Sequence, residues 1–143
     1  MILIDANLLL FAYDTTSAFH KPAKAWLEEV LSGHSPVGFS WSTLLAFLRI
    51  STNPRAFKRP LTSTAAIEIV SDWVGQPVVD IIGPGERYWE LLARLIQQGQ
   101  ASGPIIMDAA LAALSVEHGA VLYTHDRDFE KFPGVEVRYP LLS

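Results

Sequence analysis

Short apolar segments that alternate with longer, helix-like segments constrain the fold of this chain most strongly. Five segments have the length and composition of short strands, namely 1–4, 36–40, 78–82, 120–124 and 135–139. Near-continuous apolar strands of this kind are typical of parallel sheets that are covered by helices on both faces. The alternation therefore predicts an α/β protein, a three-layer α/β/α sandwich on a mainly parallel sheet of four to five strands.

The segments between these strands are predicted to be helices. They are 7–13, 18–31, 42–50, 64–74, 83–99 (after an initial turn) and 105–119, whereas 51–63 is a loop and 125–132 is a loop or a short turn of helix. Pro22 either shortens the second helix or marks its true start. Ser40 or Ser42 is available as the N-cap of the third.

Composition narrows the class of protein further. The chain has 143 residues, of which 50% are hydrophobic and 18% charged, so we expect one globular domain over 1–143. The absence of cysteine excludes disulfides and thiolate chemistry and fits a cytoplasmic protein. No basic leader follows Met1, and the longest uncharged stretch, 37–48, is too short to span a membrane, so no membrane association is expected.

Three aspartates occupy positions where a parallel sheet binds ligands. Asp5 follows the first strand and Asp126 the fourth, and ligands bind outside the carboxyl ends of such strands. Asp108 falls in the first turn of the helix at 105–119, where the helix dipole favours a negative charge. If the three carboxylates converge, each pair about 4 Å apart repels by roughly 4 kcal/mol at an effective dielectric of 20. Protonation or a divalent cation must then relieve the repulsion, and ligands that offer only oxygen favour Mg²⁺ or Mn²⁺.

Each acid also has an ordinary explanation when it is taken alone. Asp5 can be the N-cap of the first helix, and Asp108 a first-turn acid with no further role. Asp126 and Asp128 can be turn residues. The histidines, His125 among them, lack metal-ligand spacing and are expected at the surface. Only the joint placement of the acids indicates a site, while the net charge of −4 argues against a general polyanion binder.

Three motifs resemble one known family. MILIDANLLL, MDAALAALSVEHGA and LYTHDRDFEKFPGV, in this order, are similar to motifs of the PIN-domain ribonucleases and above all of the VapC-type toxins of toxin–antitoxin pairs. The resemblance covers essentially the whole chain. It implies a metal-dependent endoribonuclease that hydrolyses RNA phosphodiester bonds, with one or two Mg²⁺ or Mn²⁺ ions that activate water.

The resemblance also implies roles for individual residues. Asp5, Asp108 and Asp126 correspond to the catalytic acids and metal ligands, and Asp128 to an additional metal ligand. Asn7 and Thr124 correspond to supporting polar residues.

One position departs from the family pattern. The family places a glutamate three residues before Arg49, where this chain has Ala46. Ser42 and Thr43 are nearby hydroxyls that can hold water but cannot supply the charge. The departure leaves open an alternative function, a weakened or inactive PIN-like module that binds RNA or protein.

The remaining expectations concern partners. Arg49, Arg55, Lys58 and Arg59 are candidate RNA-binding residues. Phe57 is either a base-stacking residue among them or a core residue. We expect Trp41, Trp73 and Trp89 to be core or interface aromatics rather than stacking platforms. The resemblance implies a homodimer and a cognate antitoxin whose tail reaches the acidic groove. Phosphatase and receiver-domain functions are disfavoured, because their additional acids are missing.

Overall fold

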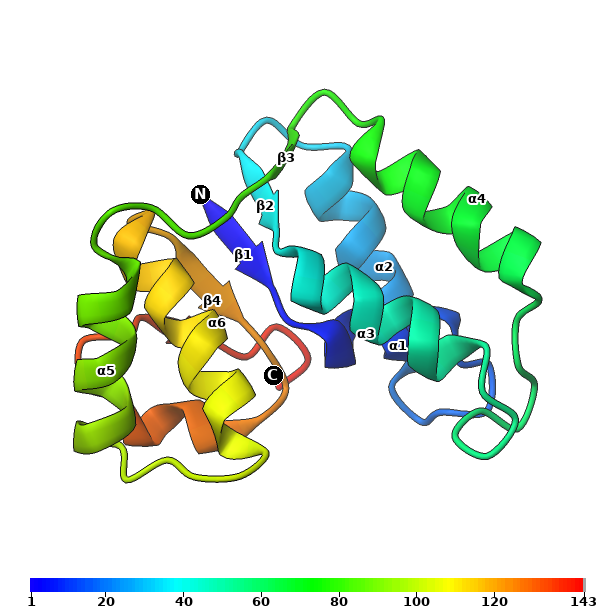
Figure 1. The fold of residues 1–143 in the computed structure, drawn as a ribbon. Coiled ribbons are helices and arrows are strands. Elements are labelled where there is room, and N and C mark those ends of the chain that lie inside the picture. Colours follow the sequence, from blue (N-terminus) through cyan, green and yellow to red (C-terminus); the bar gives the residue numbers. More distant parts are fainter. Residues whose placement is uncertain (143) are drawn as a thin grey trace.

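The computed structural model describes residues 1–142, and their strands form one five-stranded parallel sheet (Figure 1). The strand order is β3-β2-β1-β4-β5. The strands are β1 (Ile2–Ile4), β2 (Val37–Phe39), β3 (Val79–Ile81), β4 (Val121–Tyr123) and β5 (Val137–Arg138). Ile2 pairs with Val37 on one side and with Val121 on the other, so β1 lies at the centre. Because all neighbours are parallel, every strand ends at the same edge of the sheet, and the predicted fold class is confirmed.

The helices agree with the predicted segments, and only α2 and α5 begin more than one residue away from the predicted start. They are α1 (Ala6–Tyr13), α2 (His20–Leu31), α3 (Trp41–Ser51), α4 (Ser63–Val74), α5 (Tyr88–Gln98) and α6 (Ile105–Glu117), followed by the 3₁₀ helix η1 (Arg127–Lys131). Pro22 lies in the first turn of α2, where its missing N–H costs no helical hydrogen bond. α5 begins at Tyr88 because residues 82–85 form an irregular connection from β3 and residues 86–87 a turn. None of the helices in the described part of the chain is long and apolar enough to cross a membrane.

Two hydrophobic cores lie on the two faces of the sheet. Leu3 points into a core with side chains of α5 and α6, including Leu91 and Leu95, whereas its neighbour Ile4 points into a core with helices α1 to α4. This alternation is the period of two that a strand imposes on its side chains. Figure 1 shows α5 and α6 on one side of the strands and α1 to α4 on the other. The sheet therefore holds the carboxyl edge of β1 and β4 between two helical layers.

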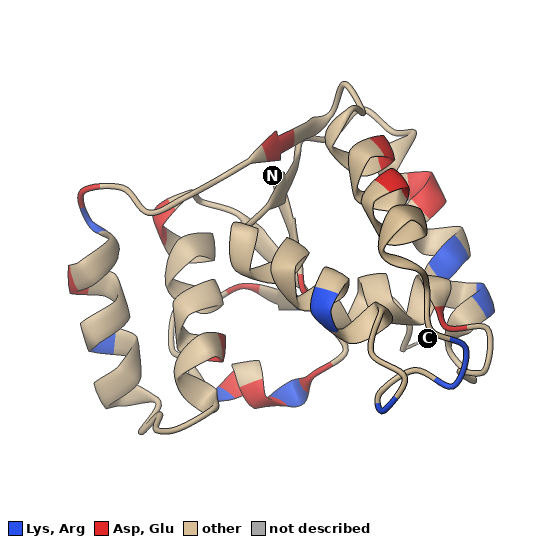
Figure 2. Ribbon diagram, turned by 45° about the vertical axis from the view of Figure 1, so that its right-hand side comes forward, with Lys and Arg blue, Asp and Glu red and all other residues tan. Residues whose placement is uncertain are grey.

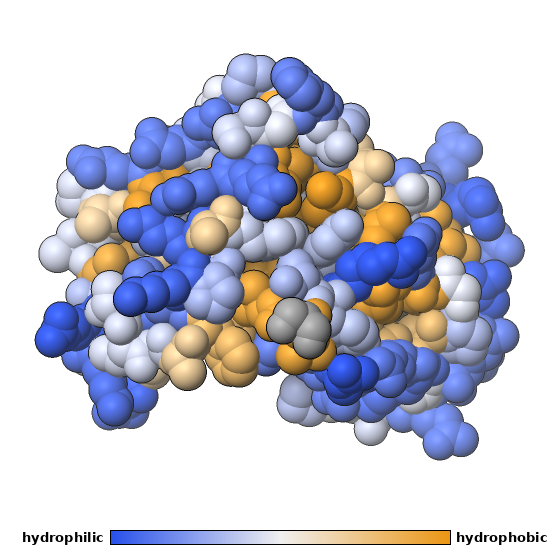
Figure 3. Space-filling model, turned by 180° about the vertical axis from the view of Figure 1, so that it is seen from behind, coloured by the Kyte–Doolittle hydropathy of each residue, from blue (hydrophilic) through white to orange (hydrophobic). Residues whose placement is uncertain are grey.

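The large aromatic residues divide between the core and the surface. Trp73 is buried in the second core and Phe57 is 5% exposed, so a base-stacking role for Phe57 is wrong and its core alternative is correct. Trp41 and Trp89 do not belong to the core, since they are 61% and 71% exposed. The face of the molecule that lies behind in Figure 1 carries hydrophobic patches that are separated by hydrophilic residues (Figure 3).

Candidate metal centre

Asp5 combines a capping role with a position at the carboxyl edge of the sheet. Its backbone N–H donates to the carbonyl oxygen of Tyr123 in β4 (2.9 Å), which continues the pairing of the two strands. Its Oδ1 accepts the N–H of Ala6 (2.7 Å), so Asp5 is the N-cap of α1. The ordinary explanation of Asp5 is thus correct as far as it goes. The cap uses only one carboxylate oxygen, however, and the second is available to other groups.

A polar network holds the second oxygen of Asp5. Thr124 Oγ1 donates to Asp5 Oδ2 (2.8 Å), and Asn7 Nδ2 donates to the same oxygen (3.3 Å) and to Thr124 Oγ1 (3.1 Å). The backbone N–H of His125 completes the network by donating to Asn7 Oδ1 (3.2 Å). The structure therefore brings Asn7 and Thr124 to the positions expected of supporting residues, although they are 117 residues apart.

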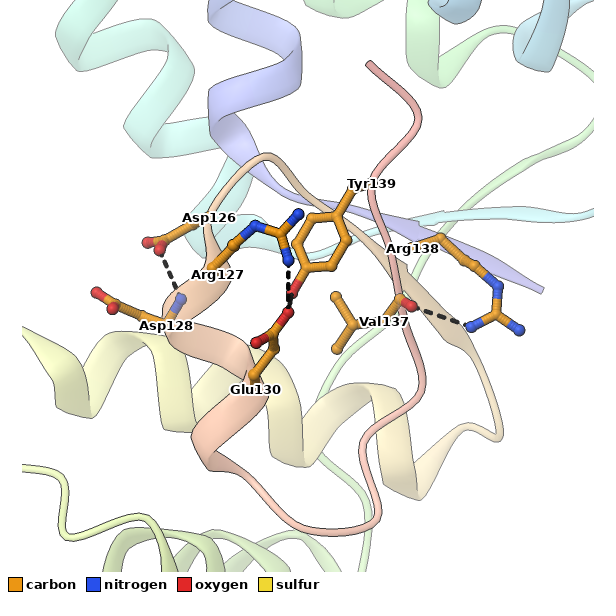
Figure 4. Close-up of polar contacts among 7 residues, drawn as sticks. All are labelled: Asp126, Arg127, Asp128, Glu130, Val137, Arg138 and Tyr139. Atoms are coloured by element: carbon orange, nitrogen blue, oxygen red, sulfur yellow. Dashed lines mark hydrogen bonds and ion pairs between the residues drawn. The ribbon is translucent and has the colours of Figure 1, made fainter. Parts of the chain in front are cut away.

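Asp126 and Asp128 form the opposite side of the centre. The N–H of Asp126 donates to Thr124 Oγ1 (3.0 Å), and Asp126 Oδ1 accepts the N–H of Asp128 (2.8 Å), which caps η1. Figure 4 shows the two carboxylates on one side of this turn and Arg127 on the other. Arg127 pairs there with Glu130 (3.0 Å) and lies 4.9 Å above the centroid of the Tyr139 ring. The guanidinium of Arg127 therefore makes its contacts away from the two carboxylates.

The tightest group of acids consists of Asp108, Asp126 and Asp128. Each offers a carboxylate oxygen, and these oxygens all lie within 4.8 Å of one another. Asp108 comes from the first turn of α6, as expected. Asp5 lies outside this trio but close enough to raise the pKa of Asp108. Carboxylate oxygens in such a cluster fit a hard divalent cation such as Mg²⁺ or Mn²⁺.

The electrostatics of the site reflect the crowding of negative charge. Burial, followed by the charges of Asp126, Asp5 and Asp128, raises the pKa of Asp108 from its ordinary value of 3.8 to about 6. Burial also raises the pKa of Asp5, although the hydrogen bonds from Thr124 and Ala6 lower it in part. Figure 2 shows acidic residues on α6 and η1, and Arg49 is the basic residue in the last turn of α3. The centre thus has an excess of negative charge that a bound cation would compensate.

Without metal, the free energy of unfolding is expected to fall as the pH rises from about 4 to about 6. The raised pKa of Asp108 means that the folded state binds more protons than the unfolded state in this window, so stability is lost as the pH passes the folded pKa. The loss should be about 1 kcal/mol, since partial exposure screens the carboxylate. Urea unfolding in EDTA at pH 4.5 and pH 7.5 measures it. Asp108→Asn should lack this component, and an identical pH dependence in both proteins would contradict the assignment.

A pocket of about 520 Å³ opens beside the acids. Its lining comes from the residues that follow β1, from α3 and from the first half of α6, and consists of Asp5, Ala6, Ser42, Thr43, Leu45, Ala46, Arg49, Met107, Asp108 and Leu111. Ala46 therefore faces the acids, and the pocket has room for the side chain that the family pattern places there. Arg49 also lies at this pocket. Arg55, Lys58 and Arg59 are exposed on the connection between α3 and α4 and are not among the lining residues.

The hydroxyls at the start of α3 are arranged around Ser40. Ser40, rather than Ser42, is the N-cap, because its Oγ accepts the N–H of Thr43 (3.1 Å). Ser40 Oγ also donates to Thr43 Oγ1 and contacts Ser42 Oγ, both at 3.0 Å. Thr43 is buried, whereas Ser42 is exposed at the pocket. Ser42 is thus the hydroxyl that is freer to hold water.

His125 is not the surface residue that its lack of ligand spacing suggested. Its ring is partly buried against Phe11 and Phe19, with centroids 5.4 and 4.4 Å away, and Nδ1 is buried without a hydrogen-bond partner among the described residues. The reason is tertiary, since the segment after α1 folds over the loop that follows β4. Sequence reasoning also missed Leu45 and Met107 as pocket residues, because no local pattern separates an apolar pocket wall from a core face.

The fold and the site together define a parallel-sheet α/β protein with an acidic centre at the carboxyl edge of its sheet. A family model described as the PIN domain matches residues 2–135. The chain therefore belongs to the PIN-domain family, as the sequence motifs suggested.

The relatives of known name agree with this assignment. The chain is 44% identical to ribonuclease VapC37 of Mycobacterium tuberculosis over 140 residues, which are 98% of this chain and 97% of that protein. It is 34% identical to ribonuclease VapC33 of the same species, with 99% of both chains covered. Among solved structures, VapC20 of M. tuberculosis, described as a toxin that cleaves the sarcin–ricin loop, has a TM-score of 0.68 at 20% identity, covering 97% of this chain and 100% of that one.

Proposed function

We propose that this protein is a metal-dependent endoribonuclease and the toxin component of a toxin–antitoxin pair, acting on RNA in the cytoplasm as one domain. The observation that carries the proposal is the trio of Asp108, Asp126 and Asp128, with Asp5 beside it, at the carboxyl edge of a PIN-domain sheet. The full-length likeness to proteins named VapC ribonucleases supports RNA as the substrate.

The acids are proposed to hold Mg²⁺ or Mn²⁺. Asp108, Asp126 and Asp128 would provide the ligands, and Asp5 would act as a further carboxylate on the β1 side. When bound, a cation would stabilise the negative charge on the phosphate that reacts and would lower the pKa of a water molecule bound to it. Thr124 and Asn7 are proposed to position Asp5, because their hydrogen bonds orient its Oδ2. The hydroxyl of Thr124 thereby contacts both the carboxylate of Asp5 and the backbone N–H of Asp126.

Arg49 is proposed to contact the RNA backbone. It lies at the acidic pocket, where a guanidinium can pair with phosphate oxygens of a strand bound across the centre. Arg55, Lys58 and Arg59 are proposed as more distant phosphate contacts, since their exposed connection begins where α3 ends. Ser42 and Thr43 are proposed as supporting hydroxyls near Ala46.

The partners follow from the same family. We propose a cognate antitoxin and a second copy of the chain, because proteins of the same fold were solved as toxin–antitoxin complexes, including one from Klebsiella pneumoniae with a TM-score of 0.67. A basic antitoxin side chain would be attracted to the uncompensated acids. The alternative of an inactive binding module rests on Ala46 alone and is not favoured, since the relatives with known names are ribonucleases.

The purified protein, separated from its antitoxin, is expected to cleave RNA in the presence of Mg²⁺ or Mn²⁺ and to stop when EDTA is added. EDTA should stop cleavage because it removes the cation from the acids. Mg²⁺ added in excess over EDTA should therefore restore cleavage. Gel analysis of labelled total RNA measures both steps, and single-stranded DNA serves as the comparison substrate. Cleavage that persists in EDTA would overturn the metal dependence, and the absence of cleavage under every metal condition would overturn the proposed activity.

A further inference from the structure

A second pocket adjoins the acidic one. It has a volume of about 260 Å³ and lies between the start of α3, the middle of α6 and the connection from β3 to α5. The two pockets share Ser42, Met107 and Leu111 in their linings. A single RNA strand bound at the acids can therefore place its next nucleotide in this second pocket.

The second pocket differs from the first in its chemistry. Its described lining residues contain no charged side chain, and they are Ser40, Trp41, Ser42, Ile82, Gly83, Pro84, Tyr88, Met107, Ala110, Leu111 and Leu114. Trp41 and Met107 stand at its rim and are 61% and 59% exposed. An exposed indole beside an apolar hollow suits a flat, uncharged group that can stack on it.

Contacts from α6 hold the wall of this pocket in place. The Glu117 carboxylate accepts the N–H groups of Gly85 (2.7 Å) and Arg87 (2.9 Å) at the start of α5. His118 Nε2 lies 2.8 Å from the carbonyl oxygen of Gly83. The Tyr88 hydroxyl donates to the carbonyl oxygen of Ala110 (3.3 Å), across the pocket wall. The pocket is consequently built before any ligand arrives, which lowers the entropy cost of binding.

We infer that this pocket binds one unstacked base of single-stranded RNA, stacked on Trp41, next to the phosphate held at the acidic centre. The inference rests on the proposed function and extends it to the recognition of the substrate. Sequence-tolerant recognition of single strands combines a charged path for the backbone with aromatic side chains for the bases. Here Arg49 and the cation proposed at the acids would provide the first part, and the uncharged pocket with Trp41 the second. Trp41 is thereby assigned a stacking role, which the sequence did not favour.

A base suits the observations better than a protein partner. The apolar surface at this point is a hollow of about 260 Å³, whereas a stable protein interface needs about 800 Å² per partner. Because the second pocket is continuous with the acidic pocket, its occupant is expected to be part of the same substrate. A second copy of the chain remains the competing occupant, and the experiment distinguishes the two.

The test measures the affinity of labelled oligoribonucleotides for an Asp126→Asn background that does not cleave them, with Mg²⁺ present. Adding Trp41→Ala is expected to weaken binding of a uridine oligomer about tenfold, and Trp41→Phe to restore most of the affinity, because stacking needs an aromatic face. Trp89→Ala removes an equally exposed indole that is not among the lining residues and should leave affinity unchanged. An abasic oligomer of the same length should bind equally with and without Trp41.

The opposite results are distinct. Equal affinity of the Trp41→Ala and parent proteins for the uridine oligomer, or an equal loss with the abasic oligomer, would overturn the inference alone. A loss of RNA affinity that follows dissociation of a dimer in sedimentation experiments would assign Trp41 to a second copy instead. If the protein with its native Asp126 cleaves no RNA and the background binds none, the proposed function fails, and this inference fails with it.

Discussion

Replacing Asp126 with Asn is expected to lower the rate of RNA cleavage by at least about 100-fold at saturating Mg²⁺. The substitution removes one negative charge and one ligand oxygen from the trio that includes Asp108 and Asp128. It should leave the fold intact, because the side-chain oxygen of Asn can still accept the N–H of Asp128 and cap η1. Cleavage of a labelled RNA measures the rate, and calorimetry with Mn²⁺ measures the loss of affinity.

Asp108→Asn should lose activity to a similar extent but affect stability differently. Because repulsion and burial already raise the pKa of Asp108, its neutral replacement should stabilise the metal-free protein near pH 7. Asp80→Asn is the matched control, since Asp80 is exposed on the edge strand β3, away from the acids. A variant at 108 or 126 that keeps more than a tenth of the cleavage rate would contradict the assigned centre.

Replacing Ala46 with Glu is expected to tighten Mn²⁺ binding by about 10- to 100-fold. Ala46 faces the pocket beside Asp5 and Asp108, so a longer acidic side chain can approach the same cation. At equal distance, the new carboxylate is attracted to the divalent cation more strongly than it is repelled by any single aspartate. Repulsion from the several aspartates together offsets part of the gain in affinity. Without metal, the same charge should lower the free energy of unfolding by about 1 kcal/mol.

The control for this change is Ala46→Gln, which has nearly the same size without the charge and should leave the affinity unchanged. Calorimetry in Mn²⁺ compares the three proteins, and RNA cleavage at limiting Mg²⁺ shows whether affinity limits the rate. If Glu and Gln at position 46 bind Mn²⁺ equally well, the pocket beside Ala46 does not lie next to the cation. The trio on the α6 and η1 side would then be the whole centre.

Much of the fold could be predicted because its determinants are local. Strand segments such as 1–4 and 120–124 are apolar and short, and the helices between them are bounded by capping residues such as Ser40 and Thr62. The placement of Asp5 and Asp126 after parallel strands was enough to predict their convergence. The comparisons confirm the fold class and the family, and the roles of the individual acids remain predictions.

Other features could not be predicted, because they depend on how distant segments pack. Asp128 rather than Asp5 completes the tightest trio, since the 3₁₀ turn after Asp126 directs both carboxylates to one side. Phe57 is buried although basic residues surround it in the sequence, and His125 is covered by aromatic residues from the segment that follows α1. In each case the deciding neighbour is remote in the chain.

The order and type of the elements, and with them the edge at which the acids gather, follow from local features of the sequence. Periodicity, capping and the direction of parallel strands are properties of short segments, which is why they could be recognised there. Which helix faces line the two pockets depends instead on how distant segments pack in three dimensions. The positions of α3 and α6 at the carboxyl edge of the sheet, together with the anchored connection before α5, place Ala46 beside the acids and leave Trp41 exposed beside an uncharged hollow.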